Sequence, residues 1–218
     1  MSNPLILVVG AGPGLGVEVA RRFGAEGYDV ALLARSPERL EHLAAVLTEE
    51  GVTVGWSVVD VTDETAMSEA LQRIVAHTGR LDVVHVNPSV FRHATPLELG
   101  LDDLLADVRV GVGALLVAAR TARPHLRRGG RIVATGSMAA DQPWHEAASL
   151  GVQKAGLRNL AQSLDATLSS DGIRAASVTV NGTLVPDTAF APARVADAVY
   201  RAATRPEQEW TAEVRYDG

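Results

Sequence analysis

The sequence predicts an α/β domain with a doubly wound, parallel central sheet. Apolar runs of strand length alternate with amphipathic, helix-length segments along the 218 residues. The apolar runs are rich in Val, Ile and Leu and alternate little with polar residues, which is typical of parallel strands buried on both faces. No linker rich in Pro, Ser and Gly interrupts this pattern. We therefore expect a single domain over residues 1–218, with seven parallel strands and helices on both faces of the sheet.

The expected elements follow one another in near-strict alternation. The strands are expected at the apolar runs Leu5–Gly10, Asp29–Ala34, Val52–Val59, Leu81–Val86, Gly130–Thr135, Ile173–Val180 and Glu209–Tyr216. The helices are expected at the amphipathic segments Gly14–Glu26, Pro37–Glu50, Asp63–Thr78, Leu101–Arg127, Ala147–Ser169 and Pro192–Thr204. Strands that alternate with helices in this way indicate parallel pairing through crossover helices.

Composition excludes several classes of function. The net charge of −6 argues against non-specific binding to nucleic acid or to an anionic membrane. The chain has no cysteine, so disulfides, thiolate metal sites and cysteine nucleophiles are excluded, and its six histidines lack metal-ligand spacing, so no metal site is expected. The chain shows neither an apolar run of about 18 residues nor a signal-peptide pattern, so we expect a cytoplasmic protein without a membrane segment.

The turn after the first expected strand carries the strongest motif. It has the sequence GAGPGLG over residues 10–16 and leads into an expected helix. Glycines let the backbone turn sharply and approach a pyrophosphate, and the helix N-terminus supplies free N–H groups and a partial positive charge. This context predicts a Rossmann-like dinucleotide site whose residues are Gly10, Gly12, Gly14, Leu15 and Gly16.

The end of the second strand favours NADP(H) over NAD(H). A site for NAD usually has an acidic residue here, whereas this chain has Ala34 followed by Arg35. Arginine suits a bidentate contact with a 2′-phosphate, although a solvated arginine near a helix start is the alternative. Asp60 and Val61 end the third strand and Asn87 follows the fourth, so all three should border the same crevice. Asp60 is expected either to accept a hydrogen bond from the adenine amino group or to cap the next helix.

These residues together resemble the short-chain dehydrogenase/reductase family over almost the whole chain. Gly10, Gly14 and Gly16 match its TGxxxGxG pattern, with Val9 in place of the threonine. The resemblance implies an NAD(P)-dependent enzyme for a small-molecule substrate, and a homodimer or homotetramer formed through the two longest expected helices. Further matches are Arg35, Asp60, Asn87 in an eroded NNAG motif, Gly136-Ser137, Lys154 and Asp217-Gly218. Asn181-Gly182 stands where the family has Pro-Gly, and Gly182 is expected near the cofactor.

The family's catalytic set is incomplete in this chain. Family members combine Asn, Ser, Tyr and Lys, the last two as YxxxK. Here Ser137 and Lys154 are present, but Leu150 stands in the place of the tyrosine and the position of the asparagine falls near Gly111. Lys154 is the only lysine among 20 basic residues, which favours a position that arginine cannot fill; a compositional bias toward arginine is the alternative. The resemblance implies that Lys154 holds the nicotinamide ribose.

A substitute proton donor must come from elsewhere in the chain. Ser137 is one candidate, and His145, in the loop before the helix that contains Lys154, is another because histidine titrates near neutral pH. An exposed loop histidine without a catalytic role is the alternative for His145. Trp144 is expected to wall an apolar pocket or simply to pack, and His93 is a weaker candidate for the donor.

Three functions stay open on the sequence alone. The first is an NADP(H)-dependent oxidoreductase for a small carbonyl or alcohol, with a proton donor other than tyrosine. The second is a redox-neutral enzyme of the same fold, such as a cyclase, isomerase or dehydratase, and the third is a non-catalytic NADP-binding protein. The sequence favours the first because the cofactor end, Ser137 and Lys154 are kept.

Overall fold

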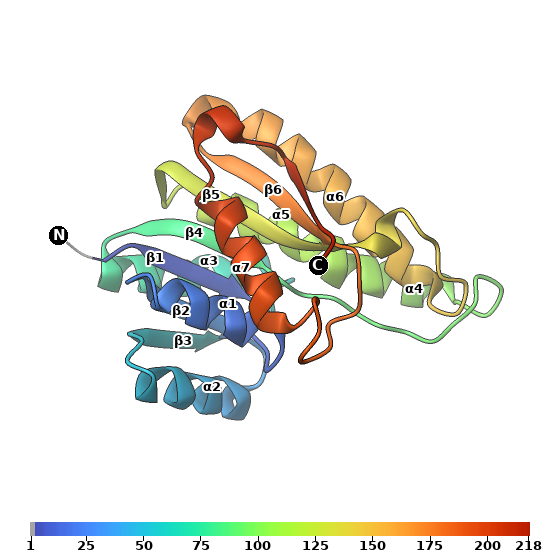
Figure 1. Ribbon diagram of the computed structural model, residues 1–218, viewed down its shortest axis with the longest axis horizontal. Helices are drawn as coiled ribbons and strands as arrows, with labels where there is room; N and C mark the ends of the chain where they lie inside the picture. The colour runs from blue at the N-terminus through green and yellow to red at the C-terminus, as the bar shows by residue number, and fades with distance from the viewer. Residues whose placement is uncertain (1–2) are drawn as a thin grey trace.

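The computed structural model describes residues 3–218, which form a seven-stranded parallel sheet covered by helices on both faces (Figure 1). This confirms the predicted fold class. The sheet order is β3-β2-β1-β4-β5-β6-β7, so the winding direction reverses between β1 and β4. The strands are β1 (Leu5–Val9), β2 (Asp29–Ala34), β3 (Val54–Val58), β4 (Leu81–Val86), β5 (Leu126–Ser137), β6 (Arg174–Val180) and β7 (Glu213–Tyr216).

Two layers of helices sandwich the sheet (Figure 1). One layer holds α1 (Leu15–Gly24), α2 (Pro37–Glu49) and α7 (Pro192–Ala203). The opposite layer holds α3 (Glu64–Thr78), α5 (Ala114–Ala122) and α6 (Ala148–Leu168), with α4 (Leu101–Val108) preceding α5. Each layer buries its own hydrophobic cluster against the sheet, which explains why the strands read as continuous apolar runs.

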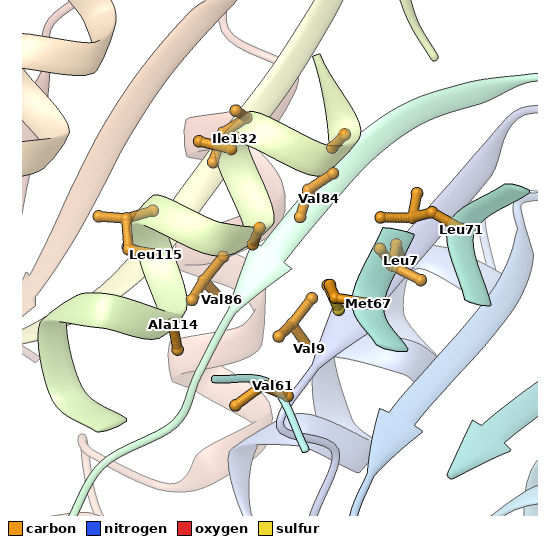
Figure 2. Close-up of a cluster of buried hydrophobic side chains, with 14 of the residues drawn as sticks. Leu7, Val9, Val61, Met67, Leu71, Val84, Val86, Ala114, Leu115 and Ile132 are labelled. Carbon is orange, nitrogen blue, oxygen red and sulfur yellow. The ribbon is translucent and has the colours of Figure 1, made fainter. Parts of the chain in front are cut away.

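Alternate strand residues supply the two clusters. In β1, Leu7 and Val9 pack toward α3 and α5, whereas Val8 packs on the α1 side. Figure 2 shows the first cluster, in which strand side chains interdigitate with those of α3 and α5. Its labelled members are Leu7, Val9, Val61, Met67, Leu71, Val84, Val86, Ala114, Leu115 and Ile132.

The prediction of a single helix over Leu101–Arg127 is wrong. The structure divides this segment into α4, a π-helical turn over Arg109–Gly113, and α5, which ends at Ala122. Pro124 cannot continue the helix because it lacks an N–H. Strand β5 begins at Leu126, earlier than the strand expected over Gly130–Thr135. π-Helical turns are uncommon and occur frequently at functional sites.

The other elements have the predicted type and differ only at their ends. The last strand starts at Glu213 rather than Glu209, because Glu207–Glu209 form a 3₁₀ turn. Polar side chains mark two helix starts: Ser36 Oγ accepts a hydrogen bond from the Arg39 amide at 3.2 Å, at the start of α2. The Asp63 carboxylate accepts one from the Ala66 amide at 3.0 Å, at the start of α3.

One histidine is buried in the middle of the sheet. His85 of β4 is 0% exposed, and its Nε2 lies 3.0 Å from Oγ1 of Thr135 on β5. Its Nδ1 has no hydrogen-bond partner within residues 3–218. Burial lowers the pKa of His85 to about 3, so the ring is neutral at neutral pH.

We expect His85 to make the fold sensitive to acid. Unfolding returns its pKa from about 3 to about 6.5, so between these values the unfolded chain binds one proton more than the folded chain. The free energy of unfolding should therefore fall as pH is lowered through this window, by up to about 1.4 kcal/mol per pH unit from this group. His85→Gln keeps a hydrogen-bonding group for Thr135 but does not titrate. Urea denaturation between about pH 6 and about pH 4 should show that the free energy of unfolding falls less for the variant than for wild type. An equal fall in both proteins would contradict this role of His85.

Candidate active site

The carboxyl ends of β1 to β4 border a cavity of about 570 Å³. It lies where the winding direction of the sheet reverses, the place where open α/β sheets bind ligands. The predicted cofactor residues Gly10, Gly12, Arg35, Asp60, Val61 and Asn87 all line it. The remaining lining residues are Ala11, Ala34, Ser36, Arg39, Pro88, Ser89 and Val110.

The glycine-rich turn permits two close approaches of the backbone. Gly10 has a φ of +80°, and a Cβ there would lie 2.9 Å from the Pro88 ring. A Cβ on Gly16 would lie 3.1 Å from Ala11 Cα, closer than most such contacts, so glycine lets α1 start this close to the turn without a shift of the backbone. These contacts explain two of the predicted glycines by packing of the chain itself.

Gly12 and Gly14, two other predicted residues of the glycine-rich turn, have open space beside them. A Cβ on Gly12 or Gly14 would meet no atom of the described chain within 4 Å. Leu15 begins α1 and is buried, so it can offer a ligand its backbone N–H but not its side chain. No side chain of residues 3–218 caps α1. The Val17 N–H donates to the Gly12 carbonyl at 3.0 Å, so the N–H groups that α1 can offer an anionic ligand are those of Leu15 and Gly16.

Two arginines gather at the β2 end of the cavity. Arg35 follows β2 and Arg39 lies in the first turn of α2, and both line the cavity with Ser36 between them. The prediction from sequence named Arg35 but missed Arg39. The signal that could have found Arg39 is its place in the first turn of the helix that follows Arg35.

Asp60 forms a local turn after β3. Its Oδ1 accepts hydrogen bonds from the Thr62 amide at 2.9 Å and from Thr62 Oγ1 at 2.8 Å. These hydrogen bonds, with a smaller contribution from the charge of Arg35, lower the pKa of Asp60. Because Asp63 caps α3 instead, the alternative in which Asp60 caps this helix is wrong. Asp60 remains on the cavity wall as an ionised acceptor.

Asn87 joins the β4 end of the cavity to the glycine-rich turn. Its backbone N–H donates to the Val9 carbonyl at 2.9 Å, and its Nδ2 lies 3.5 Å from the Gly10 carbonyl oxygen. Pro88 packs beside it against Gly10. The end of β4 is thereby held against the turn that follows β1.

Ser137 and Lys154 lie beyond this cavity, at the end of β5 and on α6. Ser137 Oγ accepts a hydrogen bond from the Ala139 amide at 3.2 Å. Lys154 is 5% exposed, and its Nζ donates to the Thr135 carbonyl at 3.0 Å. Burial lowers the pKa of Lys154 to about 8. Leu150 is half-buried one turn before Lys154 in α6.

His145 lines a second cavity of about 420 Å³, between the loop after Ser137 and the outer face of α6. The side chain is exposed, and Trp144 and Pro143 line the same cavity. The Trp144 ring lies 5.4 Å from the Phe91 ring, which in turn contacts the His93 ring at 4.8 Å between centroids. The structure thus places His145, the predicted proton donor, on a largely apolar cavity distinct from the one lined by Gly10 and Arg35.

Gly182 lies under an aromatic ring rather than on either cavity wall of the described chain. A Cβ on Gly182 would lie 2.6 Å from the Phe190 ring. The segment between β6 and α7 is tied to the end of the chain, because Tyr216 Oη donates to the Ala189 carbonyl at 2.6 Å. Phe190 also packs edge-on against Tyr216 at 5.8 Å.

Residues 3–218 contain neither a metal-binding cluster nor a membrane-spanning helix. No group of three or more His, Asp or Glu side chains in this range is arranged to hold a metal ion. None of the helices described here is both long enough and apolar enough to cross a membrane.

The family model described as short chain dehydrogenase matches residues 4–193. The chain belongs to the short-chain dehydrogenase family. This short-chain dehydrogenase is 30% identical over 177 residues to meso-2,3-butanediol dehydrogenase of Serratia marcescens, an alignment that covers 81% of this chain and 70% of that protein. Membership of the family makes it an oxidoreductase of the short-chain type.

Solved structures agree with this assignment. A short chain dehydrogenase from Mycobacterium smegmatis superposes with a TM-score of 0.92 at 25% identity, covering 100% of this chain and 92% of that one. A metagenomic short-chain oxidoreductase in complex with NADP superposes with a TM-score of 0.86 at 26% identity, covering 97% of this chain and 96% of that one.

Two glycine variants should separate folding from ligand binding in this short-chain dehydrogenase. Gly10→Ala adds a Cβ at positive φ against Pro88, so it should lower the free energy of unfolding by about 2 kcal/mol or more. Gly12→Ala adds a methyl group where no atom of residues 3–218 lies within 4 Å, so its stability should match wild type while NADPH binding weakens. Urea denaturation and fluorescence titration with NADPH measure the two effects.

Gly55→Ala serves as the control for Gly12→Ala. It lies on β3, and a Cβ there would likewise meet nothing within 4 Å in the described chain. Unchanged NADPH affinity in Gly12→Ala would show that the pyrophosphate does not lie against this turn.

Proposed function

We propose that this chain is an NADP(H)-dependent oxidoreductase for a small carbonyl or alcohol, with a proton donor other than tyrosine. The 570 Å³ cavity carries the proposal, because it combines a glycine-rich turn, an uncapped helix start and two arginines. The nicotinamide of the cofactor supplies or accepts the hydride when it is bound. The residues of the chain bind the cofactor, orient it and handle the proton.

The charges around the cavity support NADP(H) rather than NAD(H). Ala34 leaves the end of β2 without the carboxylate that usually holds the ribose hydroxyls, and Arg35 and Arg39 line the same wall. Guanidinium groups form bidentate, charge-assisted hydrogen bonds with phosphates. A family member of the same fold was solved in complex with NADP, which supports this preference.

Leu150 requires the proton to be handled by another group. A leucine side chain cannot transfer a proton, and loss of a general acid typically costs about 10²- to 10⁴-fold in rate. The Lys154 amine has a pKa of about 8 and can therefore hold or release a proton near neutral pH. The Ser137 hydroxyl at the end of β5 and the exposed His145 ring are the other candidates.

The proposal extends to assembly and location. Leu101 and Leu105 on α4, Leu116 on α5 and Val152 on α6 are at least 40% exposed, which supports a homodimer or homotetramer formed through these helices. We further propose that the protein is cytoplasmic and that its partners are small molecules rather than nucleic acid or membranes.

A redox-neutral reaction on the same fold is the second candidate. Leu150 favours it, because a reaction without hydride transfer does not need the tyrosine that the family uses. Such an enzyme would form product without consuming NADPH. The stoichiometry of NADPH oxidation against product therefore separates the two functions, and NADPH binding without any turnover would indicate a non-catalytic protein.

The arginine pair can be tested by cofactor discrimination. Arg35→Ala and Arg39→Ala should each weaken NADPH binding by about 10- to 100-fold, because each removes a charge-assisted contact, while NADH binding stays nearly constant. Fluorescence titrations with both cofactors measure this ratio. Arg73→Ala, on the exposed side of α3, is the matched control. Equal losses of NADH and NADPH affinity would argue against 2′-phosphate recognition.

Restoring a tyrosine tests the proton chemistry. Leu150→Tyr should raise the rate of NADPH oxidation with a panel of small aldehydes and ketones by about tenfold or more, because it adds a general acid one helical turn from Lys154. Gln162→Tyr, at an exposed position of the same helix, is the control. A wild-type protein that forms product without NADPH loss, and that Leu150→Tyr leaves unchanged, would contradict the redox proposal.

A further inference from the structure

Gln153 is a buried polar residue to which neither the sequence motifs nor the proposed chemistry assign a role. It lies on α6 directly before Lys154 and is 0% exposed. Its Oε1 accepts a hydrogen bond from the Val90 amide at 3.2 Å, and its Nε2 donates to the Val90 carbonyl at 3.1 Å. The side-chain amide therefore pairs with both backbone groups of one loop residue, as a neighbouring strand would.

The same side chain fills the space above Gly111. A Cβ on Gly111 would lie 2.4 Å from Gln153 Oε1 and 2.8 Å from its Cβ. Gly111 is the centre of the π turn, at the place where the family resemblance led us to expect an asparagine. A side chain from residue 111 and the side chain of Gln153 would thus occupy the same volume, so the structure accommodates only one of them.

Both segments that Gln153 contacts continue into the wall of the cofactor cavity. Val90 follows Pro88 and Ser89, which line that cavity, and Pro88 packs against Gly10. In the π turn, Val110 lines the cavity directly before Gly111. A movement of the Val90 backbone or of the π turn would therefore change the shape of the cavity.

A second link ties the same loop to α6 and α4. Asp107 is 1% exposed and accepts a hydrogen bond from Ser149 Oγ at 2.7 Å and two from the Arg92 guanidinium, at 2.9 and 3.0 Å. The Arg92 hydrogen bonds, with help from Ser149, lower the pKa of Asp107. Gln153 Nε2 lies 3.5 Å from Ser149 Oγ, so the two links share α6. The loop is held at residue 92 as well as at residue 90.

We propose that Gln153 is a positioning residue for the cofactor cavity, and that it supplies from α6 the amide that position 111 lacks. Its side chain clamps the Val90 backbone and presses on the π turn, and so fixes the walls formed by Pro88, Ser89 and Val110. The Gln153 amide is engaged with Val90 and Ser149, so it acts through position and does not transfer protons. This inference rests on the proposed function in that it takes the 570 Å³ cavity as the cofactor site.

The first test removes the hydrogen bonds but keeps the volume. Gln153→Met leaves both groups of Val90 without their partner, so the loop over residues 86–92 should exchange its amide hydrogens faster and NADPH should bind about tenfold more weakly. Hydrogen–deuterium exchange and NADPH titration are both measured well below the melting temperature. Gln162→Met, exposed on the same helix, is the control and should match wild type in both measurements.

The second test moves the amide to the facing position. Gly111→Asn alone should weaken NADPH binding, because its side chain collides with Gln153, and Gln153→Ala alone should weaken it by loss of the clamp. The double variant Gly111→Asn/Gln153→Ala should bind NADPH better than either single variant. If Gln153 contributed only to general stability, the losses of NADPH affinity in the two single variants would add up in the double variant.

The outcomes separate this inference from the proposed function. Wild-type exchange and affinity in Gln153→Met, or a double variant no better than Gln153→Ala, would overturn the positioning role. If wild type itself fails to bind NADPH, the proposed function fails, and exchange of residues 86–92 in the same four variants still decides whether Gln153 clamps the loop. Faster exchange in Gln153→Met and in Gln153→Ala, with exchange in the double variant slower than in Gln153→Ala, would support the clamp on its own.

Discussion

The contact between Pro88 and Gly10 is the constraint on which the cofactor cavity depends. At the reversal point of the sheet, β1 and β4 pair as far as Val9 and Val86, and the connections that follow them leave toward opposite helix layers. The segments beyond the paired strands therefore need a further contact to stay together. The missing Cβ and the positive φ of Gly10 allow Pro88 to approach, and the hydrogen bond from Asn87 to Val9 holds the approach in place. In the proposed function, the arginines after β2 and Asp60 after β3 act on a dinucleotide together with this second wall.

Helix α6 stabilises that second wall from outside while it presents Lys154 to the site. Neighbouring residues on a helix point in different directions, so Gln153 and Lys154 reach different partners. Gln153 holds the Val90 backbone, and Lys154 reaches the Thr135 carbonyl at the end of β5. One rigid helix therefore fixes the loop after β4 relative to the end of β5. This arrangement positions the buried amine relative to the cofactor cavity without a residue that bridges the two directly.

Local patterns predicted most of the fold and the cofactor half of the site, whereas tertiary contacts decided the rest. The strands and the GAGPGLG turn have signals within a few residues, so their type and place were predictable. The π turn at Arg109–Gly113 was not, because it arises where α6 packs on Gly111 and Val112, some 40 residues away in the chain. Gly182 is covered by Phe190, and His145 lies on a separate cavity, because of how distant loops run. Gln153 had no motif at all: only the structure shows that its amide occupies the space above Gly111.

On the proposed function, Leu150 stands in the place of the family's tyrosine, and Lys154 keeps its own acid–base chemistry. In the family that this chain resembles, the lysine acts on the tyrosine, which carries the proton. Here Lys154 is buried, with one carbonyl as its partner and a pKa of about 8, so its charged and neutral forms differ little in free energy at neutral pH. In the proposed reaction, hydride addition to a carbonyl leaves an alkoxide that must gain a proton, and an amine in this condition is able to supply one. An arginine in the same place would stay charged throughout, so the proposed proton chemistry favours lysine over arginine at this position.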